Sequence, residues 1–338
     1  MTTRCSLFAC LSALTANIAT SSAAAQTVLT MPGRRVEVVG LHYWTLRMVQ
    51  DSLARYAPAD SLHTHSCAAA LRYRLGFAEA AVFSGRFPGD TVYRVLVVVV
   101  EPQDSGRVQA KPAPMDTAGR REVWREATEF ARTSPAFMNA TLMYASAAGR
   151  APDASVQWAG ADSARVRRFW EFLAAHRTQA DRAAALASLR GSRNGHDRMI
   201  ASALLANFAS SDTVWWALAD ALRESDGPVR LAAINVLAGL SRSAPHAVDW
   251  GPAASALHPL LDATSPVVLP QLITVLLATG VRSDLAPELL RGGGQTLLAM
   301  AGSESPWVRS GARQLLTQLH GSDLGDDMGR WRAWVNSF

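Results

Sequence analysis

Three short segments in the second half of the chain decide the predicted fold. They are Pro228-Val229-Arg230-Leu231-Ala232-Ala233, Pro266-Val267-Val268-Leu269-Pro270-Gln271 and Trp307-Val308-Arg309-Ser310-Gly311-Ala312. Each precedes apolar residues at helical spacing, and Val229, Val267 and Val308 lie about 40 residues apart. A fainter copy starts near Arg198. Gly, Pro, Ser and Asp divide this part of the chain into helical lengths, so the sequence predicts stacked helical hairpins over residues 121–338.

The segments share the element Val-Arg-x-x-Ala. It is formed by Val229, Arg230 and Ala233, and again by Val308, Arg309 and Ala312. The middle copy departs from the element, with Val268 at the position of the arginine. The element resembles the repeats of the HEAT family, and the resemblance covers about half of the chain. It implies an α-solenoid with an extended concave surface, in which the six residues are structural parts of the repeats.

The C-terminus predicts a cap for the last repeat. Trp331 and Trp334 are three positions apart and follow a Gly- and Asp-rich stretch over residues 321–327. A terminal repeat has an apolar face without a neighbour, so we expect these two rings to cover it.

Residues 34–101 predict a separate small α+β domain with the order β-α-α-β-β. Its signals are Val36-Glu37-Val38-Val39-Gly40, the junction over residues 75–80 and the β-branched run over residues 95–101. These residues resemble the POTRA domain, a small periplasmic module best known in front of outer-membrane barrels. The resemblance covers about a fifth of the chain, and another small α+β sandwich is the alternative. The predicted fold class is therefore α+β plus all-α, a small domain followed by a HEAT-like α-solenoid.

Two further segments are predicted to be a linker and a signal peptide. Residues 102–120 mix Pro and Gly with polar residues and have no apolar period, which is typical of a flexible linker. Residues 1–25 combine Arg4, an apolar stretch and three alanines before Gln26, as a secretory signal peptide does. This predicts export to the periplasm or beyond the cell, and a disordered N-terminus is the alternative.

The composition argues against several classes of protein. Apolar residues make up 49% of the 338 residues, which favours a packed core over disorder. The net charge of +5 is spread without Lys/Arg clusters, so no nucleic-acid partner is expected. No run after the first 25 residues approaches the ~20 apolar residues of a membrane-spanning helix, so no membrane span is expected in the mature protein.

One stretch carries residue types that bind metals. His63 and His65 precede Cys67, the cysteine that would remain after removal of a signal peptide. Imidazole and thiolate are zinc ligands, but no fourth ligand stands at a recognisable spacing, and apolar residues follow directly. A helix start with a buried cysteine is therefore preferred, and no metal site is predicted.

The adjacent residues Trp215 and Trp216 are the candidate interaction surface. Neighbouring side chains on a helix point about 100° apart, so one ring is expected in the core and the other in a groove or interface. Exposed aromatic rings favour interfaces.

The sequence contains none of the catalytic motifs considered. The sequence has no His-Glu-x-x-His, no Gly-x-Ser-x-Gly, no phosphate loop and no dinucleotide fingerprint, so neither catalytic residues nor a cofactor are predicted. The expected function is an exported, non-catalytic scaffold that binds a protein or peptide through its helical repeats. The alternatives are a cell-envelope accessory protein that docks partners through the POTRA-like domain and, from another class, a lyase-type enzyme.

Overall fold

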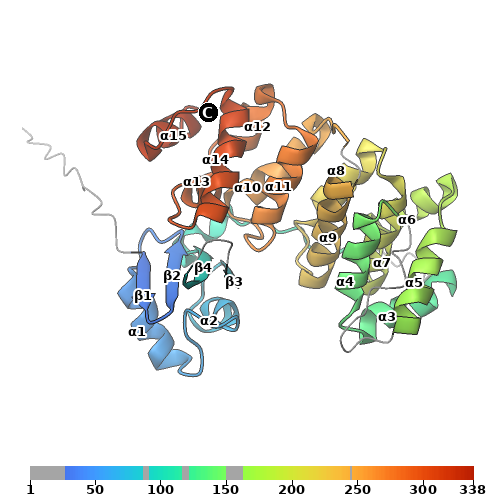
Figure 1. Ribbon diagram of the computed structural model, residues 1–338, viewed down its shortest axis with the longest axis horizontal. Coiled ribbons are helices and arrows are strands. Elements are labelled where there is room, and N and C mark those ends of the chain that lie inside the picture. Colours follow the sequence, from blue (N-terminus) through green and yellow to red (C-terminus); the bar gives the residue numbers. More distant parts are fainter. Residues whose placement is uncertain (1–26, 87–90, 116–121, 150–162, 244–245) are drawn as a thin grey trace, which may run out of the picture.

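A small β-sheet at the N-terminus is followed by a curved row of helices, as the computed structural model shows (Figure 1). The structure describes residues 27–86, 91–115, 122–149, 163–243 and 246–338. The predicted signal peptide, residues 1–25, lies outside the described residues, as do residues 116–120 of the predicted linker. The prediction of a small α+β part followed by a mainly helical part is confirmed.

The sheet has four strands in the order β1-β2-β4-β3. These are β1 (Val28–Met31), β2 (Arg34–Val39), β3 (Glu79–Gly85) and β4 (Tyr93–Val100). β2 and β4 are parallel neighbours, whereas β1 and β3 pair antiparallel at the two edges. α1 (Leu46–Tyr56) and α2 (Cys67–Arg74) complete the predicted β-α-α-β-β order, to which β1 is an addition.

β4 is buried on both faces, which explains its unbroken apolar sequence. Val95, Val97 and Val99 pack with the core that α1 and α2 cover. Leu96 and Val98, which point to the opposite face, belong to the hydrophobic core of the helices that follow. The sheet and the helical region, residues 122–338, therefore share a core.

Thirteen α-helices are described in the helical region. They are α3 (Arg125–Thr133), α4 (Phe137–Ser146), α5 (Ser163–Ala175), α6 (Gln179–Gly191), α7 (Gly195–Leu205), α8 (Asp212–Ala221), α9 (Gly227–Ser243), α10 (Ala254–Asp262), α11 (Leu269–Thr279), α12 (Ala286–Leu290), α13 (Gln295–Ala301), α14 (Pro306–His320) and α15 (Met328–Val335).

These helices pack in two rows. α6, α8, α10 and the pair α12 and α13 form the first row, and α7, α9, α11 and α14 form the second. α3 packs on α7, and α4 packs along α9. Gly239 permits the latter contact, because a Cβ at this position would lie 2.5 Å from the Cβ of Ala145.

An arginine near the start of three second-row helices makes the same hydrogen bond. Its Nη1 donates to the carbonyl oxygen six residues earlier, in the turn that precedes the helix. The pairs are Arg198 to Ser192 at 2.7 Å, Arg230 to Glu224 at 2.6 Å and Arg309 to Ser303 at 3.1 Å. The arginine thus ties the turn between the two helices of a hairpin to the second helix.

The remaining second-row helix receives this arginine from another part of the chain. By the alignment of the repeats, Val268 stands at the arginine position of α11, and Asp262 stands six residues earlier. Nη2 of Arg107 donates to the carbonyl oxygen of Asp262 at 3.2 Å, and its Nη2 and Nε bind the Asp262 carboxylate at 2.7 and 3.0 Å. Arg107 therefore takes the place of the arginine that α11 lacks.

The segment around Arg107 lies along the turns of the helical region. It begins with the 3₁₀ helix Pro102–Arg107. The Gln109 amide then donates to Thr264 Oγ1 at 2.8 Å. Lys111 Nζ reaches Asp220 at 2.6 Å, and its backbone pairs with that of residues 223 and 225. The described part of the segment expected to be a flexible linker is thus bound to the hairpin turns, because charged and backbone groups satisfy one another there.

Glu37 on β2 joins the sheet to the start of α14. Its side chain is 5% exposed and accepts hydrogen bonds from Ser303 Oγ at 2.8 Å and from the amides of Glu304 at 2.7 Å and Ser305 at 3.2 Å. These amides precede the first turn of α14, where a carboxylate is favoured by the unsatisfied N–H groups and the helix dipole. Glu37 thereby caps α14 from the sheet.

α15 covers the end of the row and packs on α13. Trp331 is fully buried, and its Nε1 donates to the carbonyl oxygen of Gly325 at 2.9 Å. The ring of Trp334 lies 6.0 Å from it in an edge-to-face arrangement, and Phe338 packs on Trp334 in turn. These aromatic rings close the apolar face of the last hairpin.

We predict that Arg107→Ala lowers the free energy of unfolding by about 2 kcal/mol, because it leaves the Asp262 carboxylate and carbonyl without charged donors. Adding Val268→Arg should restore part of this loss, since the repeat geometry directs an arginine there to the same carbonyl. Urea unfolding measures both effects. Arg291→Ala, at an exposed arginine, is the matched control, and equal midpoints for it and Arg107→Ala would contradict the assignment.

A second prediction concerns the packing of α14. Ala312 is fully buried, so Ala312→Asp should lower the free energy of unfolding by at least about 3 kcal/mol by placing an unpaired charge between helices. Ala333→Asp introduces the same charge at an exposed position of α15 and should cost little. Thermal unfolding followed by circular dichroism compares them, and similar melting temperatures would show that Ala312 is not at a close helix contact.

Candidate functional site

The six residues predicted to be structural parts of the repeats lie in the packing between helices. Val229, Ala233, Val308 and Ala312 are buried in the core, and Arg230 and Arg309 bind the hairpin turns. Their side chains are used within the protein, so the sites for ligands must be sought elsewhere.

Trp215 and Trp216 diverge, as expected for neighbours on a helix. Trp215 is 0% exposed, its Nε1 donates to the carbonyl oxygen of Ala209 at 2.7 Å, and its ring meets the edge of Trp250 at 6.4 Å. Trp216 is half-buried, and its Nε1 donates to the carbonyl oxygen of Asp249 at 2.7 Å. Trp215 therefore belongs to the core, and of the two rings Trp216 alone keeps an exposed part.

His63, His65 and Cys67 do not converge on one point. The His63 ring lies 3.0 Å from Ser61 Oγ, and His65 Nε2 lies 3.0 Å from Ser84 Oγ. Cys67 is buried at the start of α2, and this burial, with a smaller effect of Asp60, raises the pKa of its thiol to about 12. Its burial and raised pKa fit a cysteine of the hydrophobic core at a helix start.

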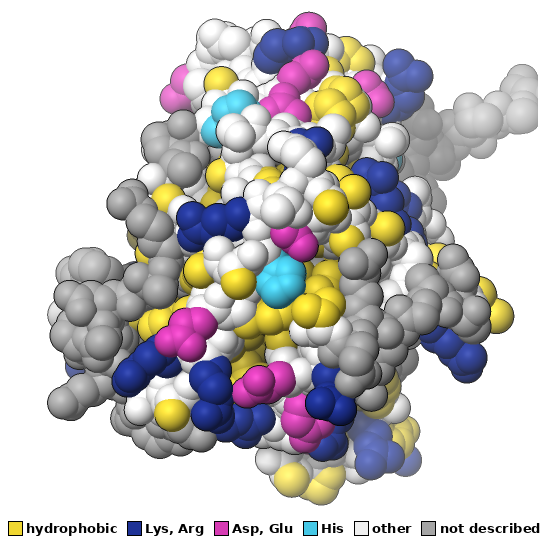
Figure 2. Space-filling model, turned by 90° about the vertical axis from the view of Figure 1, so that its right-hand side faces the viewer, with side chains coloured by type: hydrophobic (Ala, Val, Ile, Leu, Met, Phe, Trp, Pro, Cys, Tyr) yellow, Lys and Arg dark blue, Asp and Glu magenta, His cyan; other side chains and the backbone are white. Residues whose placement is uncertain are grey.

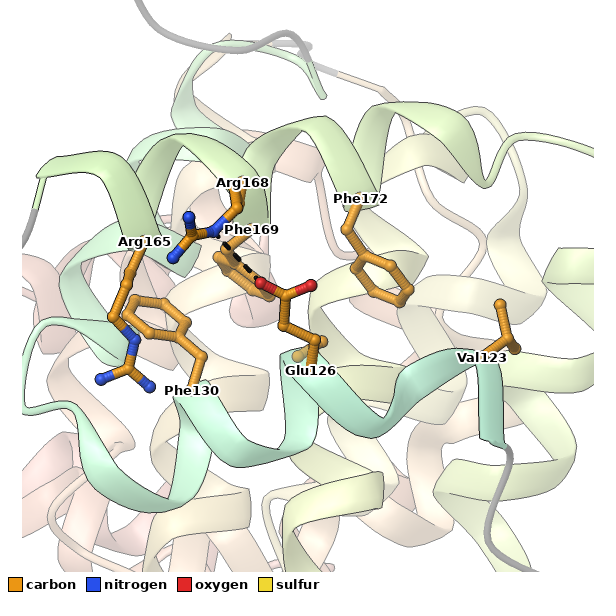
Figure 3. Close-up of a pocket in the computed structure, with 8 residues that line it drawn as sticks. Val123, Glu126, Phe130, Arg165, Arg168, Phe169 and Phe172 are labelled. Carbon is orange, nitrogen blue, oxygen red and sulfur yellow. Dashed lines mark ion pairs between the residues drawn. The ribbon is translucent and has the colours of Figure 1, made fainter.

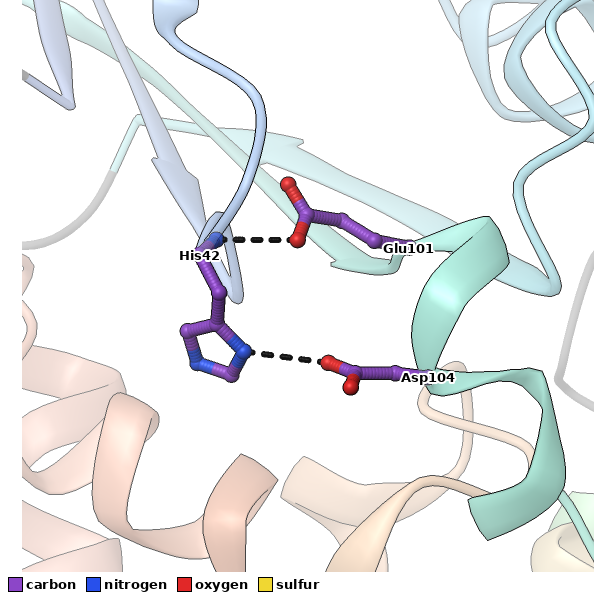
Figure 4. Close-up of side chains that lie close together, drawn as sticks. All are labelled: His42, Glu101 and Asp104. Carbon is purple, nitrogen blue, oxygen red and sulfur yellow. Dashed lines mark hydrogen bonds and ion pairs between the residues drawn. The ribbon is translucent and has the colours of Figure 1, made fainter.

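The structure brings together another group of possible metal ligands, which the sequence did not reveal. His42, Glu101 and Asp104 place one ligand atom each within 4.8 Å of one another (Figure 4). Asp104 Oδ2 lies 3.0 Å from His42 Nδ1 and 3.2 Å from Nη1 of Arg107. The group lies where β2 and β4 end, because parallel strands present their carboxyl ends at the same edge of a sheet.

Both carboxylates of this group already have donors. Glu101 is fully buried and accepts hydrogen bonds from the amides of His42 at 3.0 Å, Tyr43 at 2.8 Å and Trp44 at 2.7 Å. A cation would have to compete with these three amides and with Arg107 for the same oxygens. The arrangement therefore fits a clamp that fixes the loop after β2 to the 3₁₀ helix Pro102–Arg107.

A small pocket of about 90 Å³ lies between α3 and α5 (Figure 3), at the end of the helical region that is far from the sheet (Figure 1). Its lining residues are Val123, Glu126, Ala127, Phe130, Arg165, Arg168, Phe169 and Phe172. We refer to it as the α3–α5 pocket.

The floor of the α3–α5 pocket is aromatic and its rim is charged. The rings of Phe130 and Phe169 lie 5.2 Å apart, and Phe137 packs against both. Arg168 Nε pairs with Glu126 at 3.1 Å, and the Arg165 guanidinium lies 5.4 Å from the centre of the Phe130 ring. Figure 2 shows the molecule from this side, with hydrophobic side chains in a furrow between charged ones. Such a site favours an apolar side chain with polar neighbours.

A group of buried and half-buried charges lies at α7 and α9, and Glu79 of β3 interacts with it. Arg198 pairs with Glu224 at 3.5 Å and with Asp226 at 3.4 Å. The side chains of Arg198 and Glu224 are each 1% exposed. Arg72 lies 3.6 Å from Glu79, which interacts electrostatically with Arg230 as well. Burial raises the pKa of Glu224 and of Glu79, although the nearby arginines act in the opposite direction.

The buried glutamates predict a pH dependence of stability. Because the pKa of Glu224 is raised above its ordinary value of 4.5, the folded protein binds this proton more tightly than the unfolded chain does. The free energy of unfolding should thus fall as pH rises from about 4.5 through the raised pKa. Glu224→Gln should reduce this fall, whereas Glu288→Gln, at an exposed position of α12, should not. Urea unfolding over a pH series tests this, and identical pH profiles for the two variants would refute it.

Comparisons of this chain with protein-family models, with curated proteins and with solved structures find no match. The functional argument therefore rests on the geometry of the α3–α5 pocket and on the sequence.

Proposed function

We propose that the protein is an exported, non-catalytic scaffold that binds an acidic protein or peptide segment at its helical region. One apolar side chain of the segment enters the α3–α5 pocket, and its acidic neighbours meet the arginines at the rim. The observation that carries this proposal is the aromatic floor of Phe130 and Phe169 beneath Arg165 and Arg168.

The proposed HEAT-like nature of the helical region is supported by a recurring contact. Three second-row helices carry an arginine that binds the carbonyl six residues earlier, and the fourth has Arg107 at that place. A bond that recurs once per hairpin is expected of a repeat array, in which each unit packs mainly on its neighbours. The POTRA-like nature of the N-terminal domain is proposed from its β-α-α-β-β order.

Export remains a proposal that rests on residues 1–25. Among the helices in the described ranges, none combines the length and the apolar character needed to cross a bilayer.

Two other surfaces of the helical region are covered from within the chain, which favours the α3–α5 pocket. The segment from residue 102 to residue 115 and the sheet lie on the hairpin turns, and α4 covers α9. α5 carries three arginines and one glutamate, and its exposed Arg167 adds to the positive charge beside the pocket. An acidic ligand complements this charge, which sets orientation and speeds association.

We predict that selection from a displayed peptide library enriches sequences with one large apolar residue flanked by Asp or Glu. Arg168→Glu should weaken binding of the selected peptides about tenfold, because it replaces an attractive charge with a repulsive one. Val123→Asp, at a residue that is 62% exposed on the rim, should have a similar effect without harming the fold. Fluorescence polarisation with the labelled peptides measures the affinities.

Arg291→Glu provides the matched control, because this exposed arginine follows α12, on the part of the helical region away from α3 and α5. Enrichment of peptides without acidic residues, or equal affinities for Arg291→Glu and Arg168→Glu, would contradict the proposal. Binding that persists in all three variants would favour docking at the sheet instead.

A further inference from the structure

A solvent-open recess lies on the sheet domain, apart from the α3–α5 pocket. Four segments form it: the turn between β1 and β2, the loop before α2, the end of β3 and the start of β4. The residues that line the recess are Pro32, Gly33, Arg34, His63, Thr64, His65, Ser84, Arg86 and Tyr93. Its volume of about 610 Å³ lies within the range of small-molecule sites.

The recess combines positive charge with hydrogen-bond donors. Two arginines, two histidines, two aliphatic hydroxyls and a phenol line it, and none of its described lining residues is acidic. Arg34 lies over the ring of Tyr93, with its guanidinium carbon 5.9 Å from the ring centre. Within the described part of the chain, neither Arg34 nor Arg86 pairs with a carboxylate. Both guanidinium groups are therefore available to an anion from solution.

Hydrogen bonds hold the polar side chains of the recess in place. The Tyr93 hydroxyl donates to Ser84 Oγ at 3.1 Å, and Ser84 Oγ lies 3.0 Å from His65 Nε2. Thr64 Oγ1 donates to the carbonyl oxygen of Ser61 at 2.8 Å and accepts from its amide at 3.3 Å, which closes the turn that carries both histidines. Side chains that are already fixed lose little conformational entropy on binding, so the recess is preorganised for a ligand.

We infer that this recess binds the phosphate group of a phosphate ester. Guanidinium groups form paired, charge-assisted hydrogen bonds with phosphate oxygens, and the Ser84 hydroxyl and the imidazole groups can donate to the oxygens that remain. The absence of acidic groups from the described lining disfavours a cation. Two arginines are also too few for the many phosphate contacts of a nucleic acid. The group comes either from a soluble phosphate ester or from a phospholipid headgroup, which share this chemistry.

The test uses the purified protein and calorimetric titration with inorganic phosphate and with glycerol phosphate. The double variant Arg34→Ala/Arg86→Ala should weaken binding at least about tenfold. Arg34→Lys/Arg86→Lys should retain more affinity than the alanine variant, because it keeps the charge and loses the paired geometry. Arg47→Ala/Arg74→Ala removes two exposed arginines from α1 and α2 of the same domain and should leave binding unchanged.

Vesicle sedimentation distinguishes the two sources of the phosphate group. Phosphatidylglycerol vesicles that bind the protein through Arg34 and Arg86, while phosphatidylcholine vesicles bind less, would support a lipid headgroup. Binding of glycerol phosphate with no binding of either vesicle would support a soluble ester. The inference is overturned if none of these probes binds, or if the Arg34→Ala/Arg86→Ala and Arg47→Ala/Arg74→Ala variants bind them equally. Because the α3–α5 pocket is unchanged in these variants, the result does not depend on the proposed peptide site.

Discussion

The bond from Arg107 to Asp262 is the contact on which the relation between the two parts of the chain depends. A hairpin turn leaves backbone carbonyls that need donors, and burial without such donors is costly. Three hairpins meet this need with their own arginine, whereas the hairpin of α10 and α11 meets it with a residue from outside the helical region. The helical region is therefore incomplete without the segment that precedes it.

Glu37 extends the same constraint to the end of the row. The amides before α14 have their carboxylate acceptor on β2, far away in the sequence. Together, Glu37 and Arg107 oblige the sheet to lie beside α13 and α14, and they oblige the connecting segment to run back along the turns toward α3 (Figure 1). The sequence predicted two domains with a flexible linker between them. In the structure the two parts share a core, and the segment that connects them is bound to the hairpin turns.

The sequence predicted those features of the fold that are formed by residues close together in the chain. The period of the valines and the arginine beside them located the second-row helices, since each helix and its turn are close in sequence. Val268 appeared only as a departure from the repeat, because Arg107, which supplies the missing arginine, lies 155 residues before its partner Asp262. The contact between His42 and Glu101 was not predicted for a similar reason. They meet because β2 and β4 are parallel neighbours, and strand order does not follow from the composition of the strands.

The candidate binding sites were hard to predict for a further reason, which also bears on what the scaffold does. Phe130 and Phe169 are each ordinary helical core residues, and they form a pocket because α3 and α5 meet at the end of the row, where no further hairpin among the described residues covers them. The proposed phosphate recess lies at the sheet, which is on the other side of the molecule in Figure 1. If the two proposed sites act together, their separation is set by the helical row and by the bound connection, since Arg107 and Glu37 prevent the sheet from moving freely. A fixed distance between the two sites favours simultaneous binding only of ligands whose own binding groups are the same distance apart. The contacts of Arg107 and Glu37 would then also determine which ligands can occupy both sites at once.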